Sequence, residues 1–175
     1  MRTIVVLGLS TVLNVSGLAS AAAQNNVNAV RARTFDQLWA VVKPFGSSLH
    51  YRVYGLPKDP FTIQAFYDKD LHYTPRFEIY ISVTRQQTIQ FRIYPQFFGS
   101  YLNLDSLSNE DSLMERVLRF SDKGFFFWAA DENRDVFAGY TFTLESGFPE
   151  EAIKEVLKSI PLLDSSVGEL TAFRE

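Results

Sequence analysis

The stretch Arg76 to Tyr94, RFEIYISVTRQQTIQFRIY, decides the fold. On each side of the Gln86-Gln87 turn every second residue is apolar, and the residues between them are polar, charged or tyrosine. A period of two over this length is typical of antiparallel strands with one dry face and one wetter face. We therefore expect a β-hairpin that belongs to a one-sided sheet.

The segments around this hairpin extend the pattern. Further strands are predicted at residues 49–54, 61–67, 125–130 and 136–145. Helices are predicted at residues 35–45, from near Ser108 to Gly124, and from Pro149 to Ile160. The order helix, four strands, helix, two strands, helix predicts an α+β domain, with helices packed on one face of an antiparallel sheet of about five to six strands.

The first residues resemble an export signal. Met1-Arg2 gives a positive start, Ile4 to Leu13 is mostly apolar, and Ala19 to Ala23 offers small residues for cleavage. About ten apolar residues fall short of the roughly 20 that cross a bilayer, so a short membrane anchor is the weaker alternative. We expect a signal peptide at residues 1–23 and a periplasmic or secreted protein without a membrane span after cleavage.

The rest of the chain is interpreted as a flexible leader at residues 24–33, one domain at residues 34–161 and a C-terminal tail at residues 162–175. Absence of cysteine excludes disulfides, thiolate metal sites and a lipid-anchoring cysteine. The formal net charge of −3, with acidic and basic residues interspersed, argues against a nucleic-acid partner.

No motif predicts catalysis, so we expect a protein that is not an enzyme and needs no cofactor. His50 and His72 lie in different elements and have no nucleophile motif or metal-ligand spacing beside them. The acidic segments 68–70 and 131–135 are interpreted as turns rather than Ca²⁺ sites, because Asp and Asn bond readily to their own backbone. A catalytic triad assembled from distant residues stays an open alternative, ranked last.

The aromatic content, with 16 Phe and 8 Tyr, is the feature that bears on function. These rings cannot all share the face of the alternating aliphatic residues, and Tyr, Trp and Phe are enriched at protein interfaces. The alternative is that the rings have a structural role only and pack the sheet and its loops. Candidate partner-binding residues are Tyr54, Tyr80, Tyr94, Phe97, Phe98 and Tyr101.

The segment Phe125 to Ile160, FFFWAADENRDVFAGYTFTLESGFPEEAIKEVLKSI, resembles the end of YbjN-type domains. FDQLWAVVKPFG followed by LHYRVYG is similar to the opening of that family. The resemblance covers residues 34–160 and implies a sensory-transduction regulator with a fold similar to type III secretion chaperones and no enzymatic residues. The turn at Thr84 to Gln87 departs from the acidic or cysteine-containing turn of many family members, and Phe and Tyr are more frequent here.

Together these observations predict an exported protein that binds a protein partner in a chaperone-like or regulatory role, with a homodimer as one form of that association. The alternative is a small apolar ligand held between the first helix and the sheet, near Trp39 and Trp128.

Overall fold

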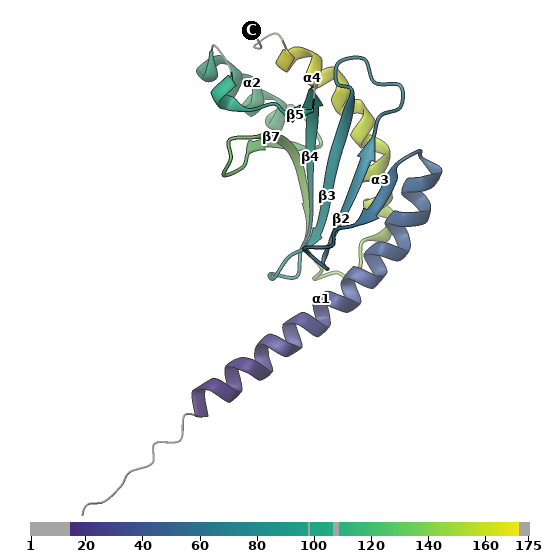
Figure 1. Ribbon diagram of the computed structural model, residues 1–175, viewed down its shortest axis with the longest axis vertical. Coiled ribbons are helices and arrows are strands. Elements are labelled where there is room, and N and C mark those ends of the chain that lie inside the picture. Colours follow the sequence, from purple (N-terminus) through teal and green to yellow (C-terminus); the bar gives the residue numbers. More distant parts are fainter. Residues whose placement is uncertain (1–14, 98, 107–108, 172–175) are drawn as a thin grey trace, which may run out of the picture.

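The computed structural model describes residues 15–97, 99–106 and 109–171, and Figure 1 shows its arrangement. Its strands form an open, antiparallel seven-stranded sheet in the order β1-β2-β3-β4-β7-β6, with β5 paired to β4. The helices are α1 (Val15–Ser48), α2 (Glu110–Lys123), α3 (Glu150–Ser159) and α4 (Leu163–Thr171), with 3-10 turns η1 (Leu104–Ser106) and η2 (Ile160–Leu162). The strands are β1 (Arg52–Gly55), β2 (Thr62–Tyr67), β3 (Arg76–Val83), β4 (Ile89–Phe97), β5 (Ser100–Tyr101), β6 (Phe127–Ala130) and β7 (Val136–Phe142).

The hairpin predicted from Arg76 to Tyr94 is confirmed as β3 and β4, which lie in the middle of the strand order. Ile79 lies opposite Ile93, Ile81 lies opposite Phe91, and all of these side chains are fully buried. The prediction of an α+β protein with an antiparallel sheet is therefore confirmed. The short strand β5 and the helix α4 are additions to the predicted elements.

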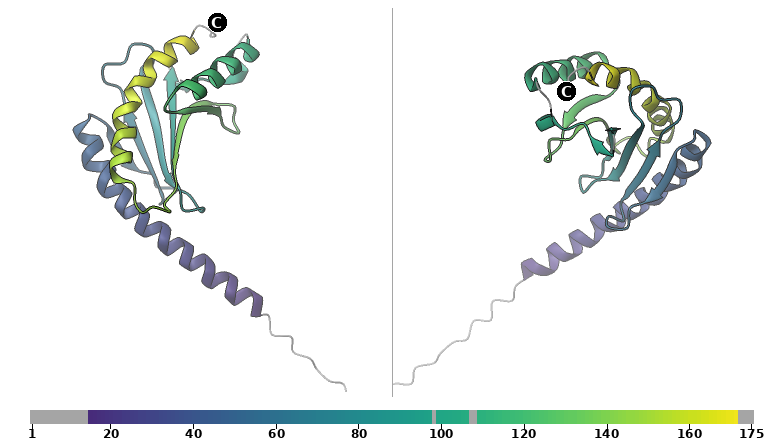
Figure 2. Two further views of the ribbon diagram at one scale, coloured as in Figure 1. Left: turned by 180° about the vertical axis from the view of Figure 1, so that it is seen from behind. Right: turned by 45° about the horizontal axis from the view of Figure 1, so that its top comes forward.

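The helices lie on one side of the sheet. Figure 1 looks onto the strands with α3 and α4 behind them, and the reverse view in Figure 2 shows these helices crossing in front of the strands. Ile153, Val156 and Leu157 of α3 are fully buried, and the Tyr51 hydroxyl donates to the carbonyl oxygen of Leu157 at 2.6 Å. In the described part of the chain, no helix covers the opposite side, which we call the open face.

Helix α1 is longer than expected and includes residues 24–33, for which the sequence suggested a flexible leader. Arg31 fixes this part of the helix. Its guanidinium donates to the carbonyl oxygen of Val83 through Nη2 at 2.7 Å and Nε at 3.1 Å, and its Cζ lies 4.0 Å from the centre of the Phe61 ring. The signal peptide predicted at residues 1–23 lies partly outside the described residues and stays a prediction.

No helix among the described residues combines the length and the apolar content that crossing a bilayer requires.

The segment expected as a C-terminal tail forms α4 and completes the core. Leu163, Val167 and Leu170 are buried against the rest of the protein, while residues 172–175 lie outside the described part. The moderate apolar content after Pro161 is compatible with a helical turn or with loose packing, and the structure shows a helix.

Asp164 attaches α4 to the loop between β2 and β3. Its side chain is 6% exposed, and its carboxylate accepts the backbone N–H groups of His72 at 2.6 Å, Tyr73 at 3.0 Å and Thr74 at 3.1 Å. A buried carboxylate is tolerated where several donors replace the water it has lost. This contact fixes the start of α4 relative to the sheet.

Replacing Asp164 by alanine should lower the free energy of unfolding by about 3 kcal/mol, because each buried donor left unpaired costs roughly 1–3 kcal/mol. Urea unfolding of the Asp164→Ala variant measures this loss. Asp36→Asn, on the exposed side of α1, is the control and should change stability by less than about 0.5 kcal/mol. Equal effects of the two substitutions would show that the carboxylate does not hold α4.

Candidate functional site

The register of the sheet determines which side chains occupy the open face, because residues directly opposite in antiparallel strands share a face. One row crosses the sheet from β1 to β6 and consists of Tyr54, Gln64, Tyr80, Arg92, Gly139 and Phe127. The next row contains Arg52, Phe66, Glu78 and Tyr94. The open face is therefore rich in tyrosine, phenylalanine and arginine.

Five rings on this face form a continuous series, which we call the aromatic stripe. The ring centre of Tyr94 lies 5.9 Å from that of Tyr80, 4.7 Å from that of Tyr101 and 5.5 Å from that of Phe137. Phe127, on β6, extends the series, with its ring centre 6.2 Å from that of Phe137. Aromatic pairs at these distances stabilise one another beyond the area they bury. The stripe connects β3 to β6 across the sheet.

The structure brings together three of the predicted site residues, Tyr80, Tyr94 and Tyr101. Tyr54 lies on the same face at the edge strand β1, with its side chain 50% exposed. The prediction for Phe97 is wrong, because β4 continues to this residue and its side chain points to the helix side, where it is 4% exposed in the core. Phe98 lies outside the described residues.

Phe127 and Phe137 were missed by sequence reasoning. Their place on the open face follows from the pairing of β6 with β7, which opposes Phe127 to Gly139. The ring of Phe127 lies over Gly139 so closely that a Cβ atom there would overlap it. Glycine at this position therefore lets an exposed ring lie flat on the sheet. Strand alternation alone could have placed Phe137 on the open face, because its neighbours Val136 and Ala138 are core residues.

Glu78 is the centre of a hydrogen-bond network beside the stripe. Its side chain is 6% exposed, and its carboxylate accepts from Gln64 Nε2 at 2.6 Å, from the Tyr80 hydroxyl at 2.6 Å and from Gln96 Nε2. Burial raises the pKa of Tyr80, and the hydrogen bond to Glu78 raises it further. Burial likewise raises the pKa of Tyr101. These hydroxyls therefore stay protonated at neutral pH, and the network fixes the rings rather than supplying a general base.

A polar hollow of about 770 Å³ adjoins this network. Glu78, Gln96 and Tyr101 border it on the sheet, and Asp105 and Asp135 border it on the neighbouring loops. Its carboxylates do not converge: within residues 15–97, 99–106 and 109–171, no three His, Asp or Glu side chains gather as metal ligands would.

The acidic segment 131–135 behaves as the predicted turn. Asp131 Oδ1 accepts the backbone N–H groups of Asn133 at 2.9 Å and Asp135 at 3.0 Å, and its Oδ2 accepts from the Tyr94 hydroxyl at 3.1 Å. The turn thus holds the central ring of the stripe in place.

Arg92 is the charged side chain nearest the middle of the open face. Its Cζ lies 5.1 Å from the centre of the Phe137 ring, and its buried Nε has no hydrogen-bond partner. Among the described residues, no carboxylate forms an ion pair with it. A guanidinium that is partly removed from water without a counter-charge favours an external carboxylate.

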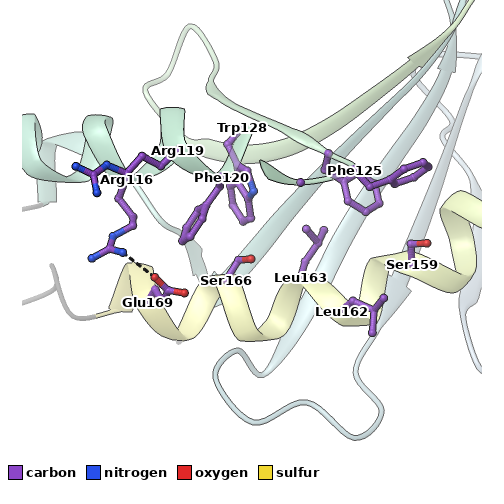
Figure 3. Close-up of a pocket in the computed structure, with 12 residues that line it drawn as sticks. Arg116, Arg119, Phe120, Phe125, Trp128, Ser159, Leu162, Leu163, Ser166 and Glu169 are labelled. Atoms are coloured by element: carbon purple, nitrogen blue, oxygen red, sulfur yellow. Dashed lines mark hydrogen bonds and ion pairs between the residues drawn. The ribbon is translucent and has the colours of Figure 1, made fainter. Parts of the chain in front are cut away.

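A second concave region lies on the helix side, between α2 with the start of β6 and the helix α4. We call it the α2–α4 groove, and Figure 3 shows the residues that line it. Its volume is about 580 Å³, within the roughly 300–1,000 Å³ of small-ligand sites. It is not the predicted pocket near Trp39 and Trp128, because α1 packs along β1, whereas Trp128 belongs to β6 at the opposite edge of the sheet.

Comparisons of the chain with protein-family models, with curated proteins and with solved structures found no match. The resemblance to YbjN-type domains, and the chaperone-like fold that it implies, therefore stay predictions.

The buried hydroxyl of Tyr94 predicts a loss of stability at high pH. Burial raises the pKa of Tyr94 to about 12, above the value of about 10 for an unfolded chain. Its contribution to stability is therefore complete below about pH 10 and is lost as the pH rises toward about 12, since the unfolded chain releases its proton first. Urea unfolding across this range should show a shallower decline for Tyr94→Phe than for the wild type.

Phe137→Leu is the control for this measurement, because it loosens the stripe without removing a titrating group. It should lower stability equally at each pH. Identical pH slopes for the wild type and Tyr94→Phe would contradict the assignment of the decline to Tyr94.

Proposed function

We propose that this protein is an exported, non-enzymatic binding protein whose open face docks a partner protein. The observation that carries the proposal is the aromatic stripe, together with Arg92 at its side, whose Nε has no hydrogen-bond partner, on a face that the described helices leave uncovered. The pattern of residues 1–23 supports export, and the family resemblance supports a regulatory or chaperone-like role.

The composition of the open face supports a protein partner. Tyrosine, phenylalanine and arginine are enriched in the centres of protein interfaces, whereas lysine and acidic residues are depleted there. The strands present Arg52, Arg76 and Arg92 on this face but a single acidic side chain, Glu78. Glu78 is satisfied by its own network, Arg52 pairs with Asp68, and Arg76 donates to Gln96. Arg92 is then the charged strand residue of this face whose Nε has no hydrogen-bond partner. A partner segment with apolar side chains and at least one carboxylate therefore fits this face.

Two exposed aromatic residues mark the ends of the proposed interface. Tyr54 is 50% exposed on β1, and Phe127 is 38% exposed on β6, so the two ends of the face each present a ring to solvent. Buried, clustered rings with arginine beside them are typical of the residues that dominate binding energy. The interface should extend between these rings, across β2, β3, β4 and β7.

A photo-crosslinking residue in place of Tyr54 tests the proposal in the native host. It should capture one defined protein, while the same residue in place of Leu118, which is 64% exposed on α2, should not. The purified partner should then bind Arg92→Gln about tenfold more weakly than the wild type, the factor expected for loss of one charge-assisted contact. Leu118→Ser, the control on the helix side, should bind as the wild type does.

Capture of a second copy of this chain, with a doubled mass in solution, would identify the open face as a homodimer interface and overturn the proposal of a different partner. Equal crosslinking from positions 54 and 118, or unchanged affinity of Arg92→Gln, would show that binding does not use the open face.

A further inference from the structure

We propose that the α2–α4 groove is a second binding site, specific for an alkyl carboxylate such as a single-chain fatty acid. The site is separate from the open face, because the groove lies on the helix side of the sheet. The proposal rests on how apolar and charged side chains are distributed along the groove.

The middle of the groove is aromatic on the wall formed by α2 and β6, and α4 contributes Leu163 and Ser166 to the other wall. Phe120 of α2 and Trp128 of β6 have ring centres 6.0 Å apart, and Leu163 of α4 points toward them in Figure 3. Gly124 at the end of α2 lets the chain turn tightly into this wall, since a Cβ atom there would lie 2.7 Å from the carbonyl oxygen of Phe120. An apolar ligand would contact ring faces on one wall and the methyl groups of Leu163 on the other.

One end of the groove presents apolar side chains to water. Leu162 is 73% exposed and Phe125 is 52% exposed, and both line the groove. Phe125 is held in place by stacking on Tyr140, with ring centres 4.7 Å apart. Covering such surfaces removes apolar area from water and so stabilises a complex. This end therefore suits the terminal part of an alkyl chain.

The other end carries two arginines, each paired with a glutamate, and these exposed pairs can exchange partners. Arg116 Nη1 lies 2.9 Å from Glu169 Oε2, and Arg119 pairs with Glu115. All four side chains of these pairs are at least 44% exposed, and exposed ion pairs contribute little to stability. Replacing one of these carboxylates by that of a ligand thus costs little, and the arginine fork binds a carboxylate with two parallel hydrogen bonds.

The groove is small and its two ends differ in chemistry. Its volume of about 580 Å³ lies within the roughly 300–1,000 Å³ of small-ligand sites. A thin molecule with a carboxylate at one end matches both this volume and the separation of charged and apolar ends seen in Figure 3.

Calorimetric titration of the purified full chain with dodecanoate, below its micelle concentration, tests this inference. One molecule of dodecanoate should bind per chain, and dodecanol and dodecyltrimethylammonium should bind about tenfold more weakly or not at all, because they cannot accept from the arginines. Arg119→Gln should weaken dodecanoate by about tenfold and leave dodecanol unchanged. Arg85→Gln, in the exposed turn between β3 and β4, is the matched control and should bind as the wild type does.

Leu162→Glu tests the apolar end without endangering the fold, because the side chain is largely exposed. It should weaken dodecanoate and dodecanol alike. The open-face variant Arg92→Gln should bind dodecanoate as the wild type does. The proposal for the groove can therefore fail while the proposal for the open face stands, and the reverse.

Three results would overturn the inference: no binding of dodecanoate, unchanged binding by Arg119→Gln, or unchanged binding by Leu162→Glu. Displacement of dodecanoate by an amphipathic helical peptide of higher affinity would also overturn it, because the groove would then be a site for a protein.

Discussion

Burial of one face of the sheet is the constraint on which the structure depends. A row of side chains crosses the sheet on the helix side and is almost completely removed from water: Val53, Ala65, Ile79, Ile93 and Ala138. Full burial of one large aliphatic side chain stabilises a fold by roughly 1.5–3 kcal/mol. The cover comes from helices at both ends of the chain, α1 before the strands and α3 with α4 after them.

This one-sided cover also determines the open face. Successive residues of a strand point to opposite sides of the sheet. The neighbour of each aliphatic core residue therefore lies on the uncovered side. Several of those neighbours are rings, and their polar atoms are satisfied within the protein: Tyr94 donates to Asp131, and Tyr80 donates to Glu78. The aromatic stripe is thus an ordered surface, in which Arg92 is the charge left without an acidic partner among the described residues.

The groove arises from the same layer of helices. Helix α4 is fixed by Asp164, which holds the loop between β2 and β3 and follows the groove residue Leu163 directly. Helix α2 packs on β6 through Phe120 and Trp128. The space between the two helices is therefore bounded by elements that are anchored separately and joined by the ion pair of Arg116 with Glu169. Two surfaces result, one on each side of the sheet, and their chemistry differs: rings with an arginine beside them on one side, and an apolar channel with a charged end on the other.

The sequence by itself determined the features that depend on neighbouring residues: the hairpin from Arg76 to Tyr94, the acidic turn after Asp131, and the shared face of Tyr80 and Tyr94, because strand alternation and turn chemistry are local. Only the tertiary structure decided the features that depend on distant contacts. Residues 24–33 join α1, which Arg31 fixes to the carbonyl oxygen of Val83, far away in the chain. Phe97 turns to the core because β4 is prolonged by pairing with β5, and the groove exists because Asp164 anchors a segment that showed no strong pattern of its own.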